Sequence, residues 1–190
     1  MGSGLSTASA VRSKSASPDT ALPRLTLVLG GARSGKSRYA EALIGEQPAI
    51  YIATATAGDE DMSARIRAHR ARRGGNWTTR EAPLDLAATL AAGDGRPRLV
   101  DCLTLWLSNL LLAGRDPAAE AAALLRSLPR LSGPTVFVAN EVGLGIVPDN
   151  ELARRFRDHA GRLNQDLAAV ADRVVFIAAG LPMILKDSSR

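Results

Sequence analysis

The chain has 190 residues, of which 46% are hydrophobic and 23% are charged, and its formal net charge is +5. This length predicts one domain with a core of its own, and the longest uncharged apolar stretch, residues 102–114, is too short to span a membrane. The single cysteine, Cys102, excludes an intrachain disulfide and fits a reducing cytoplasm, while the mild positive charge argues only weakly for a nucleic-acid partner.

The N-terminal segment differs in composition from the rest of the chain. Residues 1–22 consist largely of Gly, Ser, Ala and Thr, with few large apolar side chains and no continuous apolar run of the kind found in secretory signals. We therefore predict a disordered extension over residues 1–22 that carries no chemistry, and a single folded domain over residues 23–190.

The first element of that domain is a short apolar strand that leads into a glycine-rich loop and a helix. Residues 25–29 predict a buried parallel strand, and residues 36–44 predict an amphipathic helix. Between them, the segment Gly30-Gly31-Ala32-Arg33-Ser34-Gly35-Lys36-Ser37 matches the phosphate-binding pattern G-x-x-x-x-G-K-[ST]. All eight residues are expected to contact a nucleoside triphosphate, with Lys36 acting catalytically on the β and γ phosphates and Ser37 coordinating Mg²⁺.

A candidate strand at residues 49–54 is followed by a segment with an unusual charge pattern. Acidic residues begin it and five arginines end it between positions 65 and 73, an order that suits the helix dipole and predicts a helix over residues 60–72. His69 lies among these arginines. It is either part of a packed stripe with Met62 and Ile66, or a neutral imidazole nucleophile beside phosphate-binding guanidinium groups.

The remaining chain alternates between strand-like and helix-like segments. Strands are expected at residues 98–102, 135–139 and 174–178, and helices at residues 104–113, 117–128 and 150–171. This alternation predicts an α/β fold, namely a RecA-like P-loop NTPase domain of three layers with a mostly parallel sheet.

A P-loop enzyme also needs a carboxylate at the end of a neighbouring strand to hold Mg²⁺. Asp101 fits this requirement, because it ends the strand at residues 98–102. It could instead cap the helix that starts near Thr104, and the two roles can coexist. We favour the metal role.

Several segments together resemble the bifunctional adenosylcobinamide kinase and adenosylcobinamide-phosphate guanylyltransferase family of cobalamin biosynthesis. The resemblance covers nearly all of the folded region. It includes residues 30–38, 51–55, 65–70, 101–104, 109–111 and 154–165, and most specifically Asn140-Glu141-Val142-Gly143-Leu144-Gly145-Ile146-Val147-Pro148. A generic P-loop kinase is not expected to show all of these segments in this order.

The resemblance implies two consecutive reactions on a corrinoid. Adenosylcobinamide is phosphorylated with ATP or GTP, and GMP is then transferred from GTP to adenosylcobinamide phosphate, which gives adenosylcobinamide-GDP and pyrophosphate. The resemblance also implies a guanylyl-histidine intermediate at His69, because His159 lies outside the matching motif and is expected to be a packed or partly buried helix residue. A homo-oligomer, a trimer, is expected as well.

Further nucleotide contacts are implied by position. Glu81 and Asp101 are expected to contact the nucleotide. At the position of Asp101 the family often has glutamate instead. The guanosine site is expected to be lined by Ala53, Thr54 and Ala55, with Arg70, Ala71, Arg72 and Arg73 around the phosphates or ribose. Residues 140–148 are expected to form either a corrinoid site or a subunit contact.

Two other functions remain open at this point. One is a P-loop small-molecule kinase without guanylyltransferase activity. The other is a RecA-like ATPase that depends on nucleic acid, although aromatic residues for base stacking make up only 4% of the chain.

Overall fold

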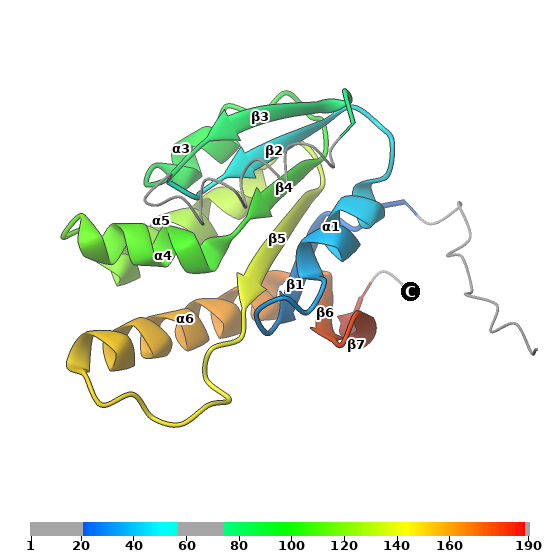
Figure 1. Cartoon of the computed structure of the whole chain (residues 1–190). Coiled ribbons are helices and arrows are strands. Elements are labelled where there is room, and N and C mark those ends of the chain that lie inside the picture. Colours follow the sequence, from blue (N-terminus) through cyan, green and yellow to red (C-terminus); the bar gives the residue numbers. More distant parts are fainter. Residues whose placement is uncertain (1–20, 57–73, 189–190) are drawn as a thin grey trace, which may run out of the picture.

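The computed structural model describes residues 21–56 and 74–188, which form a seven-stranded sheet with the order β3-β2-β4-β5-β1-β6-β7 (Figure 1). Strands β1 to β6 run parallel, and β7 is antiparallel to β6. The strands are β1 (Leu25–Gly30), β2 (Ala49–Ala53), β3 (Trp77–Glu81), β4 (Arg98–Asp101), β5 (Thr135–Asn140), β6 (Arg173–Ala178) and β7 (Leu181–Asp187).

Helices cover both faces of the sheet, so the domain has three layers (Figure 1). One face packs against α1 (Lys36–Ile44) through Ala40 and Ile44. The opposite face packs against α3 (Leu86–Ala91), α4 (Leu103–Leu112), α5 (Pro117–Ser127), the short 3₁₀ helix η1 (Leu128–Arg130) and α6 (Glu151–Val170). The predicted three-layer α/β fold with a mostly parallel sheet is confirmed.

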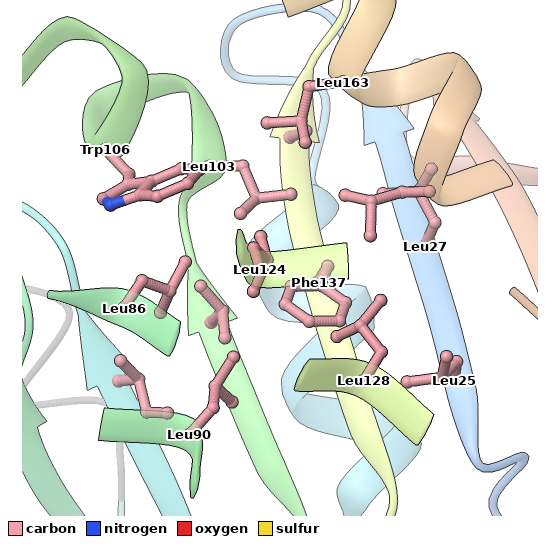
Figure 2. Close-up of a cluster of buried hydrophobic side chains, with 14 of the residues drawn as sticks. Leu25, Leu27, Leu86, Leu90, Leu103, Trp106, Leu124, Leu128, Phe137 and Leu163 are labelled. Atoms are coloured by element: carbon pink, nitrogen blue, oxygen red, sulfur yellow. The ribbon is translucent and has the colours of Figure 1, made fainter. Parts of the chain in front are cut away.

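The larger part of the core lies between the sheet and this second group of helices. Figure 2 shows Phe137 of β5 and Leu27 of β1 among leucines of α3, α4, α5 and α6. All six residues of β1 are buried, as expected for a strand covered on both faces. This packing fixes the central strands, whose carboxyl ends carry the predicted phosphate loop.

Five strands and four helices predicted from sequence are present within one residue at each end, and the helix predicted at residues 60–72 lies outside the described residues. Three elements, β3, α3 and β7, were not predicted from the sequence. Both missed strands are at the edges of the sheet, where burial no longer imposes a clear apolar pattern. Leu22, assigned from sequence to the N-terminal extension, is half-buried and packs against the core on the α1 side.

Within the two described ranges, no helix is both long and apolar enough to cross a membrane.

Candidate active site

The carboxyl ends of the parallel strands meet at one edge of the sheet. Ala53 at the end of β2 lies between Glu81 of β3 and Asp101 of β4 in the strand register. Gly30, where β1 enters the phosphate loop, pairs with Asn140 of β5. The predicted loop, both acidic residues and the start of the 140–148 segment therefore lie along the edge where open α/β sheets bind ligands, although Glu81, on β3, is four strands from β1.

Lys36 lies inside the phosphate loop. Its side chain is only 7% exposed, and its Nζ donates a hydrogen bond of 2.7 Å to the Gly31 carbonyl. Burial lowers the pKa of Lys36 from 10.5, while the negative charge of Asp101 acts in the opposite direction. Burial removes water from the ammonium, and a bound anionic phosphate would stabilise its positive charge instead. Asp101 is close enough to interact electrostatically with it.

The two glycines that open the loop are not equivalent. A Cβ on Gly30, whose φ is +153°, would lie 2.5 Å from the Ile177 carbonyl oxygen and 2.8 Å from the Ser34 hydroxyl. A Cβ on Gly31 would meet nothing within 4 Å. The loop therefore needs glycine at position 30 because the backbone of β6 approaches it closely.

The loop also presents unsatisfied donors. Helix α1 has Gly35 at its N-cap with a φ of +99°, and no side chain caps it. The Ser34 hydroxyl is buried and has no hydrogen-bond partner among the described residues. Free N–H groups at a helix N-terminus fit an anionic phosphate, so the geometry supports the ligand predicted from the motif.

Asp101 is held by a tyrosine that the sequence analysis did not single out. The Tyr51 hydroxyl donates a hydrogen bond of 2.9 Å to Oδ2 of Asp101. Helix α4 has Cys102 as its N-cap and no side-chain cap, so Asp101 does not cap it. The expectation that Asp101 ends the strand next to the phosphate-loop strand is wrong, because β5 lies between β1 and β4.

The oxygens of Ser37 and Asp101 suit Mg²⁺, which prefers hard oxygen ligands and keeps several waters. Ser37 follows Lys36 at the start of α1, and the charge of Asp101 acts on Lys36, so the two candidate ligands belong to segments that meet at this edge of the sheet. Among the described residues, no group of three or more His, Cys, Asp or Glu side chains could hold a metal ion. A magnesium ion here would thus depend on phosphate oxygens and water for its remaining ligands.

Thr54 joins the ends of β2 and β4. Its hydroxyl donates to the Cys102 carbonyl at 2.7 Å and accepts from the Cys102 N–H at 2.8 Å, and the side chain is fully buried. Asn109 of α4 donates to the Thr54 carbonyl at 2.8 Å. The hydroxyl predicted to line a guanosine site is therefore occupied by a backbone contact, whereas its neighbours Ala53 and Ala55 are half-buried.

Cys102 is buried, as expected for a small apolar side chain, and lies beside the site. Burial, with a contribution from the charge of Asp101, raises the pKa of its thiol from 9.0 to about 11. The thiol is therefore neutral at physiological pH.

The 140–148 segment starts at the site and ends at an exposed apolar surface. Asn140 donates its N–H to the Thr104 hydroxyl at 2.7 Å, and the Glu141 N–H donates to the Gly30 carbonyl at 3.1 Å. Further along, the side chains of Leu144 and Ile146 are largely exposed. An apolar groove of about 320 Å³ lies nearby, between α4 and α6, and is lined by Ser108, Leu111, Leu112, Asn150, Leu152, Ala153 and Phe156.

Some predicted site residues lie outside the described residues, namely His69, Arg70, Ala71, Arg72 and Arg73. Glu81 is exposed at the end of β3, and Trp77 is half-buried at its start, with its ring 6.1 Å from that of Tyr51. His159 is half-buried on α6.

Comparison with known proteins identifies the family. The family model described as "Cobinamide kinase / cobinamide phosphate guanyltransferase" matches residues 26–185. The chain belongs to this family. It is 56% identical over 167 residues to the bifunctional adenosylcobalamin biosynthesis protein CobP of Pseudomonas aeruginosa, an alignment that covers 84% of this chain and 96% of the relative. It is 43% identical over 180 residues to the CobU protein of Salmonella typhimurium, covering 85% of this chain and 99% of the relative.

More distant solved structures share the fold alone. A structure from Pyrococcus horikoshii OT3 has a TM-score of 0.51 at 9% identity and covers 87% of both chains. The flagellar accessory protein FlaH of Methanocaldococcus jannaschii has a TM-score of 0.50 at 12% identity, covering 87% of this chain and 80% of that one.

The predicted family and enzyme class, a kinase combined with a guanylyltransferase of cobalamin biosynthesis, are confirmed by the family match.

Proposed function

We propose that this protein phosphorylates adenosylcobinamide with ATP or GTP and then transfers GMP from GTP to adenosylcobinamide phosphate, releasing pyrophosphate. The observation that carries the proposal is the phosphate loop, with Lys36 buried inside it and Asp101 at the same sheet edge. Membership of the family supplies the substrate class, a corrinoid.

In the kinase step, the loop N–H groups and Lys36 hold the phosphates of the nucleotide. The corrinoid hydroxyl oxygen attacks the γ-phosphorus, the bond from that phosphorus to the β–γ bridging oxygen breaks, and the nucleoside diphosphate leaves. The hydroxyl proton passes to water. Mg²⁺ held by Ser37 and Asp101 would neutralise charge on the phosphate oxygens when bound. Lys36 forms a hydrogen bond inside the loop, and we propose that its ammonium stabilises the leaving diphosphate.

In the guanylyl step, we propose that neutral His69 acts as the nucleophile. A ring nitrogen bonds to the α-phosphorus of GTP, and the bond from that phosphorus to the α–β bridging oxygen breaks to release pyrophosphate. An oxygen of adenosylcobinamide phosphate then attacks the same phosphorus and displaces the histidine. The arginines at positions 70, 72 and 73 are proposed to bind the phosphates or ribose, with Ala71 beside them. Ala53, Ala55 and Glu81 are proposed to contact the nucleotide from the sheet edge.

Two further predictions belong to this proposal. We propose a homo-oligomer, a trimer; the exposed apolar side chains of Leu112, Leu144 and Ile146 support a subunit contact. We also propose a cytoplasmic location, where nucleoside triphosphates are available and the free thiol of Cys102 stays reduced.

The experiment is turnover of adenosylcobinamide with Mg²⁺ and either nucleotide, with products identified by mass spectrometry. We expect the phosphate ester first, and the GDP derivative only when GTP is present. Lys36→Ala should lower phosphorylation about 100-fold, the usual effect of removing one charge-stabilising donor. Lys186→Ala is the matched control, because that ammonium donates instead to α6 carbonyls of Ala168 and Ala169. Undiminished phosphorylation by Lys36→Ala would contradict the proposed role of the loop.

A further inference from the structure

The hairpin turn between β6 and β7 lies directly against the phosphate loop. The turn consists of Ala179 and Gly180, with φ values of +51° and +80°. The Gly180 N–H donates a hydrogen bond of 3.0 Å to the Ser34 carbonyl inside the loop. Strand β6 runs next to β1 in the sheet (Figure 1), so this contact joins two neighbouring strand ends.

Two further contacts join the loop to β6 and its turn. A Cβ on Gly30 would lie 2.5 Å from the Ile177 carbonyl of β6, and a Cβ on Gly35 would lie 3.5 Å from Cα of Gly180. The first, middle and last parts of the loop are thus each bounded by the end of β6 or by its turn. Asp101 lies on the other side of β1, beyond β5, so the turn and the carboxylate flank the loop from opposite sides.

The hydrogen bond at Ser34 has a consequence for the next N–H group. In a planar trans peptide, the C=O and the N–H point in opposite directions. When the Ser34 carbonyl is drawn toward Gly180, the Gly35 N–H must point away from the turn. Gly35 is the N-cap of α1, its φ is +99°, and no side-chain hydrogen bond caps the helix there.

We infer that the β6–β7 turn is a positioning element for the phosphate loop, in which Gly180 orients the Ser34–Gly35 peptide so that the Gly35 N–H can bind a nucleotide phosphate. This inference rests on the proposed use of the loop for a nucleoside triphosphate. Gly180 itself touches no substrate and acts through Ser34. Positive φ at both turn positions is typical of the tight hairpin that brings the Gly180 N–H to this place.

The test compares two glycine substitutions that introduce the same backbone strain. Gly180→Ala adds a Cβ that meets only the Arg38 guanidinium, at 3.8 Å, and Gly114→Ala adds a Cβ with nothing within 4 Å, at a φ of +67°. Both should lower the melting temperature to a similar extent, because a left-handed conformation disfavours alanine. Only Gly180→Ala should weaken binding of the β,γ-imido analogue of ATP with Mg²⁺, by about tenfold, and raise the KM for ATP more than it lowers kcat.

A second variant separates positioning from general damage. Asparagine tolerates positive φ better than alanine, so Gly180→Asn should bind the analogue within about threefold of the wild type. The inference is overturned if Gly180→Ala binds the analogue as the wild type does while Lys36→Ala has lost binding. If Lys36→Ala also binds normally, the loop is not the nucleotide site, and the proposed function itself fails.

Discussion

Replacing Thr54 with valine tests whether this residue joins two strands or serves the nucleotide. The change keeps the shape of the side chain but removes the hydroxyl that bonds to both backbone groups of Cys102. The Cys102 carbonyl keeps the Trp106 N–H as a partner, so the N–H of Cys102 is the group left buried without one. An orphaned buried donor costs about 1–3 kcal/mol, and a lost hydrogen bond about 1 kcal/mol more. We expect Thr54→Val to lower the free energy of unfolding by about 2–4 kcal/mol.

Urea unfolding, followed by circular dichroism, measures this change. Thr54→Ser is the control, because it keeps the hydroxyl and should cost only about 1 kcal/mol for the lost methyl group. In a domain of this size, the valine variant should also melt roughly 10 °C lower than the wild type. A Thr54→Val protein that is as stable as the wild type but binds GTP more weakly would show that the hydroxyl contacts guanosine. It would then not be the group that links the ends of β2 and β4.

Three further predictions concern the same edge of the sheet. Gly30→Ala should destabilise the protein by roughly 2–4 kcal/mol, because its Cβ clashes with the β6 backbone, and it should abolish nucleotide binding. Gly31→Ala should change the free energy of unfolding in urea by less than about 1 kcal/mol. Equal effects of the two variants would contradict the close approach of β6 to Gly30. Cys102 should react slowly with iodoacetamide at pH 8 in the native protein and rapidly in the unfolded protein. Its folded pKa of about 11 exceeds the unfolded value of 9.0, so the stability that the neutral thiol contributes is present below pH 9 and is lost as the pH rises toward 11. Tyr51→Phe should raise the Mg²⁺ concentration needed for half-maximal kinase activity about tenfold, because Asp101 loses its orienting hydrogen bond; an unchanged Mg²⁺ titration would argue against Asp101 as a ligand.

The sequence predicted the central part of the fold well, because burial on both sides leaves a strong local pattern. Strand β1 is buried throughout and was predicted from its apolar run alone. Strand β3 carries Thr78, Thr79 and Arg80 at a sheet edge, so its extended conformation depends on pairing with β2, nearly 30 residues earlier in the chain, rather than on local signals. Strand β7 contains Pro182 and exposed apolar side chains, which match neither a buried nor a half-buried strand.

The site was predictable where a local motif carries the chemistry, and not where distant segments meet. The phosphate loop was recognisable from its spacing, and the structure places Lys36 within it. The hydrogen bond from Tyr51 to Asp101, the occupied hydroxyl of Thr54 and the contact of Gly180 with Ser34 join residues about 50 to 150 positions apart. Such contacts follow from strand order, which local periodicity does not determine.

We propose that one chain uses GTP to form a guanylyl-histidine on the way to adenosylcobinamide-GDP. Incubation with Mg²⁺ and GTP labelled at the α-phosphate tests it most directly. We predict covalent labelling of the wild type through a bond that is stable to base and labile to acid, as expected for a phosphoramidate, and no labelling of His69→Ala. His159→Ala is the matched control and should label like the wild type. An unlabelled wild type, or equal labelling of His69→Ala, would show that His69 does not carry the guanylyl group.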